Sequence, residues 1–560
     1  MPKVKQNKMA RRYYKADEVR HILLQDSGSS ESDNDSDCDS ESTDNEGIEI
    51  SDLRREQVGV DNDDDTGSGS EQVSDSDSEQ ESIEPLPPKR GRAIRGTSSR
   101  SRGRGRSTSV SAVPRKQDVR AAHEQQFVAK SGKVWSSNPP PTRKRSAQNI
   151  VRSPPGLKNQ ATFGSVQEAF HLIITPDILT KILEFSNQKL KKVVEDWNSK
   201  HENNKRAYEP YTMEHLHAFL GLLILRGVLR GNHEKVQDLW KNDQFSRPIF
   251  KAVMSRTMFL ELLRIVSFDE KATRDERRVY DKLTAVRDMW EAFNKRLSAM
   301  WEPSSHVTID EQLITFRGRV TFRIYNKSKP GRYGMLIRWI CDSSYRYAVK
   351  GIPYCGVPAV GTSEAKEMNK SNNIVRQLVE PIKGSGRGVT CDRFYTDIEL
   401  AEDLYRNFNL TMTGTMQSNR RHIPEAIKDV KNREPKSSVF CFSDNCTMVS
   451  YCPKKNRNVI MASTEHHDAA ISDEDHKKPE IIMHYNATKF GVDTVDQMAR
   501  TYSTKMSTRR WTLAFFCNMI DVAAINAFTM FCEKFKDWNL NKVRLTYKMT
   551  FFIIKSRFTA

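Results

Sequence analysis

The apolar period of this 560-residue sequence changes near residue 306, and that change constrains the fold more than any other feature. Before it, apolar side chains recur at helical spacing. The expected helices cover residues 174–190, 212–229, 256–268 and 285–301. The first has a helix-start signal in Thr175 and Pro176. From His306 onward, short β-branched runs between turn residues indicate strands.

The order of the later elements predicts an α/β fold with a mixed sheet. Strands are expected at 306–316, 319–326, 334–343, 345–354, 388–396 and 410–416. Helices are expected at 362–384, 396–408, 491–502 and 511–535. Hairpins come first and strand–helix–strand crossovers follow, which matches the RNase H-like layout. Residues 417–485 interrupt this order as an insertion of mostly β and loop character.

The sequence is therefore expected to have five parts. They are a tail at 1–130, a mostly helical region at 131–305 for dimerisation and DNA binding, the first part of the core at 306–416, the insertion at 417–485, and the C-terminal helices of the core at 486–560. The tail is acidic and then basic, and it carries too few large apolar residues to offset its ordering entropy, so it is expected to be disordered.

The tail offers two kinds of contact. Its serines beside acids suit an acidophilic kinase, although an unmodified solvated tail explains them equally well. Basic clusters at 85–107 and 139–149 are typical of nuclear import signals or of nonspecific nucleic-acid contacts. We therefore expect a nuclear location.

Net charge, cysteine content and apolar stretches limit the kinds of partner that are expected. The formal net charge of +17 favours a polyanionic partner, nucleic acid first, with a merely soluble basic protein as the alternative. Nine scattered cysteines without a CxxC pair fit a reduced intracellular protein. The most apolar stretches are too short for a membrane span, so no membrane partner is expected.

Three carboxylates stand where predicted strands end or a helix begins. Asp310 follows β-branched residues, Asp392 ends a strand, and Asp493 opens a helix. An acid inside a strand is costly unless it is paired or bound to a metal. Paired divalent cations serve both ends of an in-line phosphodiester displacement. The trio thus indicates a nuclease-type core that holds Mg²⁺ or Mn²⁺.

Asp496 lies three residues after Asp493 on the same face of the expected helix, where an auxiliary ligand or a supporting group belongs. A structural role stays open for Asp392 and Asp493, because each precedes a helix and could cap it.

Five sequence motifs are long enough to be specific, and they lie in one order over roughly residues 160–550: TIDEQLITFRGRVTFRIYNKSKPGRYG, TCDRFYT, MTGTMQSNRRHIPEAIK, YNATKFGVDTVDQM and TRRW. The sequences, order and spacing of these motifs resemble those of the piggyBac family of transposases. This resemblance implies an RNase H-like DDE transposase core with an insertion domain. It also implies cut-and-paste transposition of double-stranded DNA through hairpinned ends, with insertion at TTAA, by a homodimer.

By this resemblance, the family's catalytic acids fall on Asp310, Asp392 and Asp493, and its additional acid falls on Asp496. The RW step of the family falls on Arg510 and Trp511.

Basic and aromatic residues give the candidates for DNA contact. Arg317, Arg319 and Arg323 alternate as on one strand face, Lys327, Lys329 and Arg332 follow in a loop, and Arg509, Arg510 and Trp511 precede the last helix. Nearness to Asp310 favours phosphate contact for the first six over a solvated basic face. The tryptophan suits stacking on an unpaired base at a hairpin tip, and a core tryptophan opening the helix is an equal alternative.

One departure from the family leaves a second function open. Members usually carry a C-terminal Cys/His-rich zinc module, and the final residues FFIIKSRFTA show no such cluster. In the insertion, Cys441, Cys446 and Cys452 lack zinc-knuckle spacing, and the run His466–Asp468 is expected to be solvated rather than metal-binding. The alternative to an active transposase is a domesticated or truncated transposase-derived DNA-binding or chromatin protein without catalysis.

Overall fold

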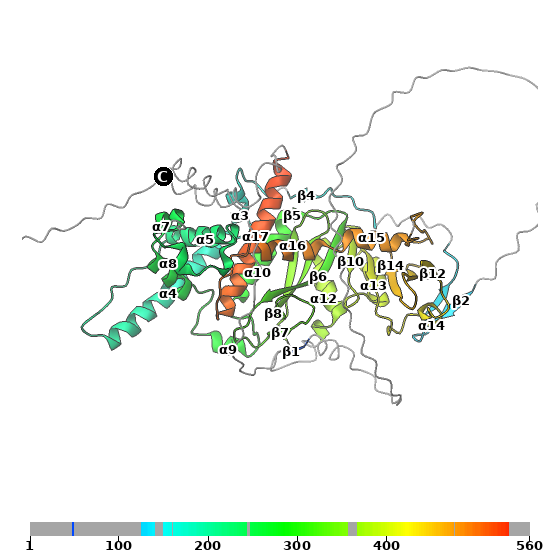
Figure 1. The fold of residues 1–560 in the computed structure, drawn as a ribbon, viewed down its shortest axis with the longest axis horizontal. Helices are drawn as coiled ribbons and strands as arrows, with labels where there is room; N and C mark the ends of the chain where they lie inside the picture. The colour runs from blue at the N-terminus through cyan, green and yellow to red at the C-terminus, as the bar shows by residue number, and fades with distance from the viewer. Residues whose placement is uncertain are drawn as a thin grey trace, which may run out of the picture. The chain divides into compact units, whose positions relative to one another are not determined.

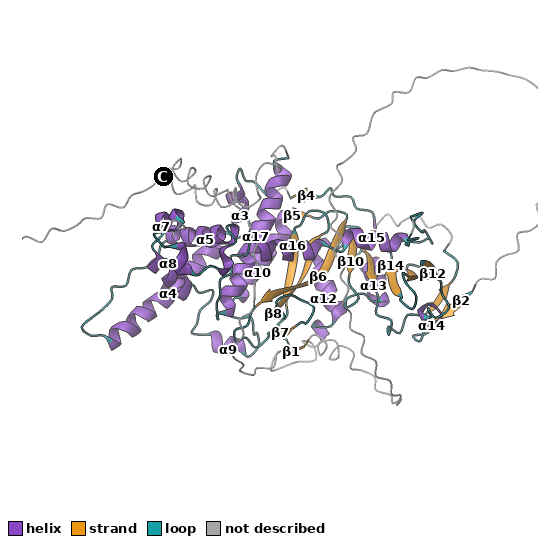
Figure 2. Ribbon diagram, in the orientation of Figure 1, coloured by secondary structure: helices purple, strands orange, loops and turns teal. Residues whose placement is uncertain are grey.

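The computed structural model describes residues 48–49, 125–140, 149–158, 161–243, 247–356, 367–474 and 476–536. The chain divides into two compact units, and all described residues belong to the unit formed by Met1–Gln57 with Glu124–Ala560. Most of the predicted tail, with its kinase-type serines and the basic cluster 85–107, lies outside the described residues, as does most of the cluster 139–149. Figure 1 shows the fold and Figure 2 its secondary structure.

Helices dominate the region before the core. They are α3 (Val166–His171), α4 (Pro176–Lys200), α5 (Met213–Val228), η2 (Gly231–His233), α6 (Val236–Leu239), α7 (Pro248–Val253), α8 (Arg256–Ile265), α9 (Arg274–Arg278) and α10 (Arg287–Met300). The four predicted helices correspond to α4, α5, α8 and α10. Helix α4 begins as expected, with Thr175 accepting a hydrogen bond from the backbone N–H of Ile178 and Pro176 in the first helical position.

A single mixed sheet forms the core. Its strands are β1 (Ile48–Glu49), β2 (Gln126–Val128), β3 (Val134–Ser136), β6 (His306–Thr315), β7 (Ile324–Tyr325), β8 (Tyr333–Asp342), β9 (Ala348–Pro353), β10 (Gly388–Cys391), β11 (Thr411–Thr415), β12 (Ser437–Phe442), β13 (Thr447–Cys452) and β14 (Val459–Ser463). The order is β1-β7-β8-β6-β10-β11-β14-β13-β12-β3-β2, with β9 also paired to β8. Strands β6, β10 and β11 run parallel, and β8 is antiparallel to β6. The mixed sheet confirms the predicted α/β class.

The insertion continues this sheet. Strand β14 pairs antiparallel with β11 of the core, so the insertion strands extend the same hydrogen-bonded ladder. The hairpin β2–β3, far away in sequence, extends the sheet beyond β12 by pairing Ser136 with Phe442, and β2 is the edge strand. Sequence patterns do not reveal this pairing, because it joins two short strands from distant segments. A separate small sheet pairs β4 (Gly156–Leu157) with β5 (Trp301–Glu302).

Helices pack along the core sheet. They are α12 (Ser371–Val379), η3 (Glu380–Ile382), α13 (Ile398–Asn407), α14 (Glu425–Lys428), α15 (Glu480–Thr488), α16 (Gly491–Thr501) and α17 (Trp511–Lys534). Helix α16 packs against β6 and β8, and α13 packs against β11. Of the predicted helix 362–384, residues 362–366 lie outside the described residues, Glu367 and Met368 are helical, and α12 and η3 cover residues 371–382 after a turn.

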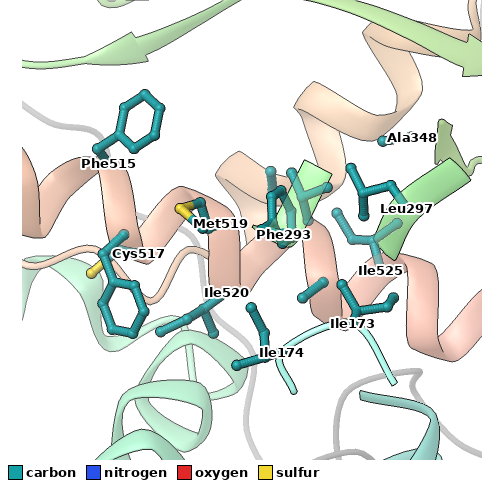
Figure 3. Close-up of a cluster of buried hydrophobic side chains, with 14 of the residues drawn as sticks. Ile173, Ile174, Phe293, Leu297, Ala348, Phe515, Cys517, Met519, Ile520 and Ile525 are labelled. Carbon is teal, nitrogen blue, oxygen red and sulfur yellow. The ribbon is translucent and has the colours of Figure 1, made fainter. Parts of the chain in front are cut away.

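Helix α17 lies in the centre of the largest hydrophobic cluster. Figure 3 shows its side chains, such as Met519 and Ile525, among Ile173 and Ile174 from the α3–α4 link and Phe293 from α10. By length and composition this helix is long and apolar enough to cross a membrane, so the expectation that the most apolar stretches are all too short is wrong for α17. In the folded protein, 89% of its most apolar window is buried, as in the core helix of a globular fold. The helix therefore holds the helical region and the core together.

One predicted strand is largely wrong. Residues 319–323 form a turn, and only Ile324 and Tyr325 pair, as β7. The turn places Phe322 in the core, 1% exposed, with its ring 5.2 Å from that of Trp511. Burial of this side chain outweighs the β-branched pattern, so the three arginines of this segment do not share a strand face.

Candidate active site and basic groove

Asp310 and Asp392 lie on neighbouring parallel strands. The parallel register of β6 and β10 pairs Ile309 with Cys391. The residues that follow this pair, Asp310 and Asp392, therefore lie side by side. Asp310 lies within β6, and Asp392 directly follows β10. Their carboxylates accept nearby backbone N–H groups, from Glu311 at 2.7 Å and from Phe394 at 3.0 Å respectively. Parallel pairing thus gathers two acids that are far apart in sequence.

Asp493 reaches the same place from the start of α16. The helix begins at Gly491, where a Cβ atom would lie 2.7 Å from the Thr308 hydroxyl oxygen of β6. Only glycine lets the helix start approach the strand so closely. Asp493 stands in the first helical turn, exposed, and its charge acts on the Asp310 carboxyl. The three predicted acids are therefore brought together.

The electrostatics of this trio suit a cation. The pKa of the Asp310 carboxyl is raised to about 8, first by burial and then by the nearby charge of Asp392. Glu311 and Asp493 act in the same direction, and the Lys329 ammonium acts against them. A set of oxygen donors that disfavours its own full ionisation is stabilised by a hard divalent cation, so these residues fit Mg²⁺ or Mn²⁺.

Sequence reasoning missed two neighbours of the trio, Glu311 and Tyr395. Tyr395 donates its hydroxyl to the Glu311 carboxylate at 3.0 Å. The ammonium of Lys329, one of the predicted basic residues, donates to the Glu311 carbonyl oxygen at 3.0 Å. The acid pair Asp310–Glu311 inside an apolar strand is the signal that could have identified Glu311. Of the predicted basic residues, Lys329 is the one whose charge acts on the Asp310 carboxyl.

Asp496 takes a different position from the trio. It is 6% exposed and pairs with Arg500, one helical turn on, at 3.2 Å. Burial is the first cause of its raised pKa, and Arg500 opposes that shift. Its side chain faces Gln312, whose amide oxygen accepts from Trp339 and Asn518. Asp496 therefore belongs to a polar layer beneath the site.

A basic groove adjoins the acids. A cavity of about 1590 Å³ lies between the end of β6, the 316–323 segment, α16, the 503–509 segment and α17. Its basic lining side chains are Arg317, Arg319, Arg323, Arg500, Lys505 and Arg509. Arg500 also lines a smaller cavity of about 520 Å³ together with Asp493. The groove therefore leads to the acidic site.

The groove collects four of the predicted DNA-contact residues. Arg317, Arg319 and Arg509 are exposed, whereas Arg323 donates to the Arg317 and Gly318 carbonyls at 3.1 Å and so shapes the loop. Lys327 and Arg332 lie in the following loop, outside the lining of this cavity. Sequence reasoning missed Arg500 and Lys505, since nothing local ties them to the first strand.

Arg510 and Trp511 have structural contacts. Arg510 donates to the carbonyl oxygens of Leu263 at 2.6 Å and Arg264 at 3.1 Å, at the end of α8, and its guanidinium also bonds Val266. Trp511 opens α17, is half-buried, and packs on Phe322 and the large core. This geometry favours the core alternative for the tryptophan.

Asp521 of α17 fixes one wall of the groove. It is 6% exposed and accepts from the Thr504 backbone N–H at 2.9 Å and the Ser503 hydroxyl at 3.1 Å. Burial raises the pKa of Asp521 to about 7. Because the folded pKa exceeds the ordinary value near 4, the folded state binds the proton more tightly. Asp521 therefore contributes stability at low pH that is lost as the pH rises to about 7.

Replacing Asp521 by asparagine tests this. The neutral amide keeps an acceptor for Thr504 and removes the titration. The melting temperature of Asp521→Asn minus that of the wild type should therefore increase as the pH rises from about 4 to about 7. Thermal melts across this range measure the difference. Asp288→Asn, an exposed acid in α10, is the control. A difference for Asp521→Asn that does not vary with pH contradicts the assignment.

Two sequence comparisons relate this chain to known proteins. Residues 165–528 match the family model described as Transposase IS4. The chain is 22% identical over 350 residues to the human protein PiggyBac transposable element-derived protein 2. That match covers 59% of this chain and 58% of the human protein, so it spans less than two thirds of that relative.

The fold is also similar to that of a solved protein. A cryo-EM structure of a piggyBac transposase synaptic complex with hairpin DNA superposes with a TM-score of 0.66 and 31% sequence identity. The match covers 73% of this chain and 85% of that one. With a family model over more than half of its length and this structural relative, the chain belongs to the piggyBac family of transposases.

Proposed function

We propose that this chain is a divalent-metal-dependent DNA transposase that cleaves and joins strands at the ends of a mobile element and inserts it at TTAA. The observation that carries the proposal is the meeting of Asp310, Asp392 and Asp493 beside an arginine-lined groove. The solved relative is a complex with hairpin DNA, which supports the same class of ligand here.

The residues divide the work by their chemistry. Asp310, Asp392 and Asp493 would hold Mg²⁺ or Mn²⁺, which supplies an activated nucleophile and stabilises the leaving oxygen when bound. The Lys329 ammonium opposes the rise in the pKa of Asp310 and so favours its ionised carboxylate, the form that binds a cation. Arg317, Arg319 and Arg509 of the groove place the phosphate backbone so that a scissile bond reaches the acids. Glu311 positions strand β6, because its carboxylate accepts the hydrogen bond from the Tyr395 hydroxyl.

The cleavage assay tests this function directly. Purified full chain is incubated with a hairpin-forming end oligonucleotide flanked by TTAA, with Mg²⁺, with Mn²⁺ or with chelator. We expect nicking only in the presence of metal. Binding of the same oligonucleotide without any nicking in either metal would overturn the catalytic proposal.

A second candidate function has one observation in its favour. The human relative is by name a transposable element-derived protein. A domesticated DNA-binding protein would retain the groove and dispense with the acids, and DNA binding without nicking is its expected signature.

Location and assembly complete the proposal. A chain that acts on two ends of one element suits a homodimer, and DNA as substrate suits the nucleus. Mass measurement of the purified protein on end DNA tests the dimer, and imaging of a tagged chain tests the location.

The groove carries a separate prediction. Changing Arg317, Arg319 and Arg509 together to alanine should weaken DNA binding about tenfold or more at moderate salt, because each guanidinium neutralises a phosphate. The slope of log affinity against log salt should become shallower by about 0.9 for each phosphate that the variant no longer neutralises. Fluorescence anisotropy over a salt series measures both.

The control keeps the same change in net charge. Lys191, Lys192 and Lys200 are exposed on α4, outside the groove, and their triple alanine variant should leave affinity and slope near wild type. Equal losses of affinity in the two triple variants would show that net charge, and not the groove, binds DNA.

A further inference from the structure

A cluster of two histidines and a glutamate lies at the junction of the core and the insertion. His306 is the first residue of β6, Glu465 follows β14, and His484 lies in α15. Their ligand atoms all lie within 4.8 Å of one another. Figure 1 shows α15 beside β14, consistent with their packing. The three residues come from three elements, so folding alone brings them together.

The distances suit a small transition-metal ion. His306 Nε2 lies 3.1 Å from Glu465 Oε1, and His484 Nε2 lies 3.8 Å from Glu465 Oε2. Two ligands of a tetrahedral zinc ion, each at about 2.0–2.2 Å, stand roughly 3.3–3.6 Å apart. The observed separations bracket that range. The side chains are 14–22% exposed, which leaves a path for an ion.

The surroundings orient two of the ligands. His306 Nδ1 lies 2.9 Å from the Ser305 hydroxyl, which leaves Nε2 for the centre of the cluster. The Thr411 hydroxyl donates to Glu465 Oε2 at 3.1 Å. Such outer hydrogen bonds fix the tautomer and direction of metal ligands. A Cβ at Gly388 would lie 2.4 Å from the His306 ring and 2.9 Å from Glu465, so glycine there opens the space.

The second cluster of this type has another explanation. Asp397, Glu399 and His422 also lie close together. Asp397, however, is the N-cap of α13 and accepts from the backbone of Glu399 and Leu400. One carboxylate oxygen of Asp397 is thus bound to the start of α13. By contrast, the hydrogen bonds of His306 with Ser305 and of Glu465 with Thr411 do not cap a helix.

We propose that His306, Glu465 and His484 bind a divalent transition-metal ion that prefers imidazole, zinc first, with water in the fourth position. The ion ties the insertion to the first strand of the core. It also anchors α15, whose last residue, Thr488, accepts from the Thr308 hydroxyl through its carbonyl at 2.6 Å. Because α16 follows at once, the ion would position Asp493 without contacting DNA.

His466 joins the cluster as a neighbour. Its ring packs against that of His484 at 4.9 Å between centroids, and its Nδ1 lies 2.8 Å from the Ser463 hydroxyl. The expectation that this histidine is simply solvated is wrong, because the ring is half-buried between β14 and α15. It supports the face of His484 rather than supplying a ligand.

Cobalt titration tests the site without reference to activity. The full chain is stripped with chelator and carries Asp310→Asn and Asp392→Asn, which removes the carboxylate site that also binds divalent ions. We expect one equivalent of Co²⁺ with the strong visible absorption of four-coordinate cobalt, displaced by Zn²⁺. His484→Gln should lower the apparent affinity more than about 100-fold, since a direct ligand matters more than its supports.

The control is His201→Gln, whose ring stacks on Trp197 at the exposed end of α4. It should bind Co²⁺ as the parent does. Equal binding by His484→Gln and the parent, or absence of the absorption in the parent, would overturn the proposal.

Glu465→Gln guards against a folding defect. The amide keeps an acceptor for Thr411 and is a poor zinc ligand. Zn²⁺ should raise the melting temperature of the stripped parent and leave that of Glu465→Gln unchanged. A rise of the same size in both proteins contradicts the site. Because neither measurement uses DNA, failure here is distinct from failure of the transposase proposal.

Discussion

Replacing Asp392 by asparagine should reduce metal-dependent strand cleavage more than about 100-fold, since even residues that only support metal ligands typically matter 10–100-fold. Asp392 lies beside Asp310 in the parallel pairing of β10 with β6, and its charge acts on that acid. An amide keeps the size and the hydrogen bond to Phe394 while it removes one anionic oxygen donor. The nicking rate on the end oligonucleotide is the measurement.

Binding of DNA should survive the same change. The groove residues lie outside the pairing of β6 and β10, and removal of a negative charge does not oppose a polyanion. Asp288→Asn, an exposed acid of α10, makes the same change in charge and should cleave as the wild type does. Cleavage by Asp392→Asn near the wild-type rate would contradict the assignment of Asp310, Asp392 and Asp493 as metal ligands.

Replacing Arg510 by alanine should lower the free energy of unfolding by about 3 kcal/mol, because hydrogen bonds from a charged group contribute about 1.5–3 kcal/mol each and are not additive. Its guanidinium holds carbonyl oxygens at the end of α8, and burial lowers its pKa. Without it, the last carbonyls of that helix lose their partner where α17 begins. Urea unfolding followed by circular dichroism measures the decrease in stability.

The neighbouring arginine is the matched control. Arg509 is exposed in the groove, so Arg509→Ala should change stability by less than about 0.5 kcal/mol and weaken DNA binding. The two variants differ by one position and by the environment of the side chain. The opposite pattern, with Arg510→Ala stable and defective only in DNA binding, would restore the stacking and contact role expected from the sequence.

Sequence patterns are informative where structure is decided locally. Strands β6 and β10 and helix α16 are each set by their own apolar pattern, so the positions of Asp310, Asp392 and Asp493 within these elements are predictable. The parallel register that brings the acids together depends on pairing across about 80 residues and on the glycine at 491. The resemblance of the motifs to a known family indicates that these acids meet, whereas the apolar periodicity of the separate elements does not.

Long-range contacts decide the rest. The pattern near β6 predicts a strand for its arginines, yet burial of Phe322 against Trp511 turns that segment into a loop. The groove needs the 503–509 segment, which Asp521 holds from α17. Arg509 and Arg510 look equivalent in sequence, and only the end of α8 distinguishes them.

The pairing of the hairpin β2–β3 with β12 bears on how the chain is made. Ser136 leaves the ribosome 306 residues before its partner Phe442 (442 − 136). At roughly 5–20 residues per second, that interval is about 15–60 s. Throughout it, Trp135, fully covered in the finished protein, has no insertion to pack against. The nascent hairpin is thus an open sheet edge with an exposed indole, the kind of segment that chaperones shield during synthesis.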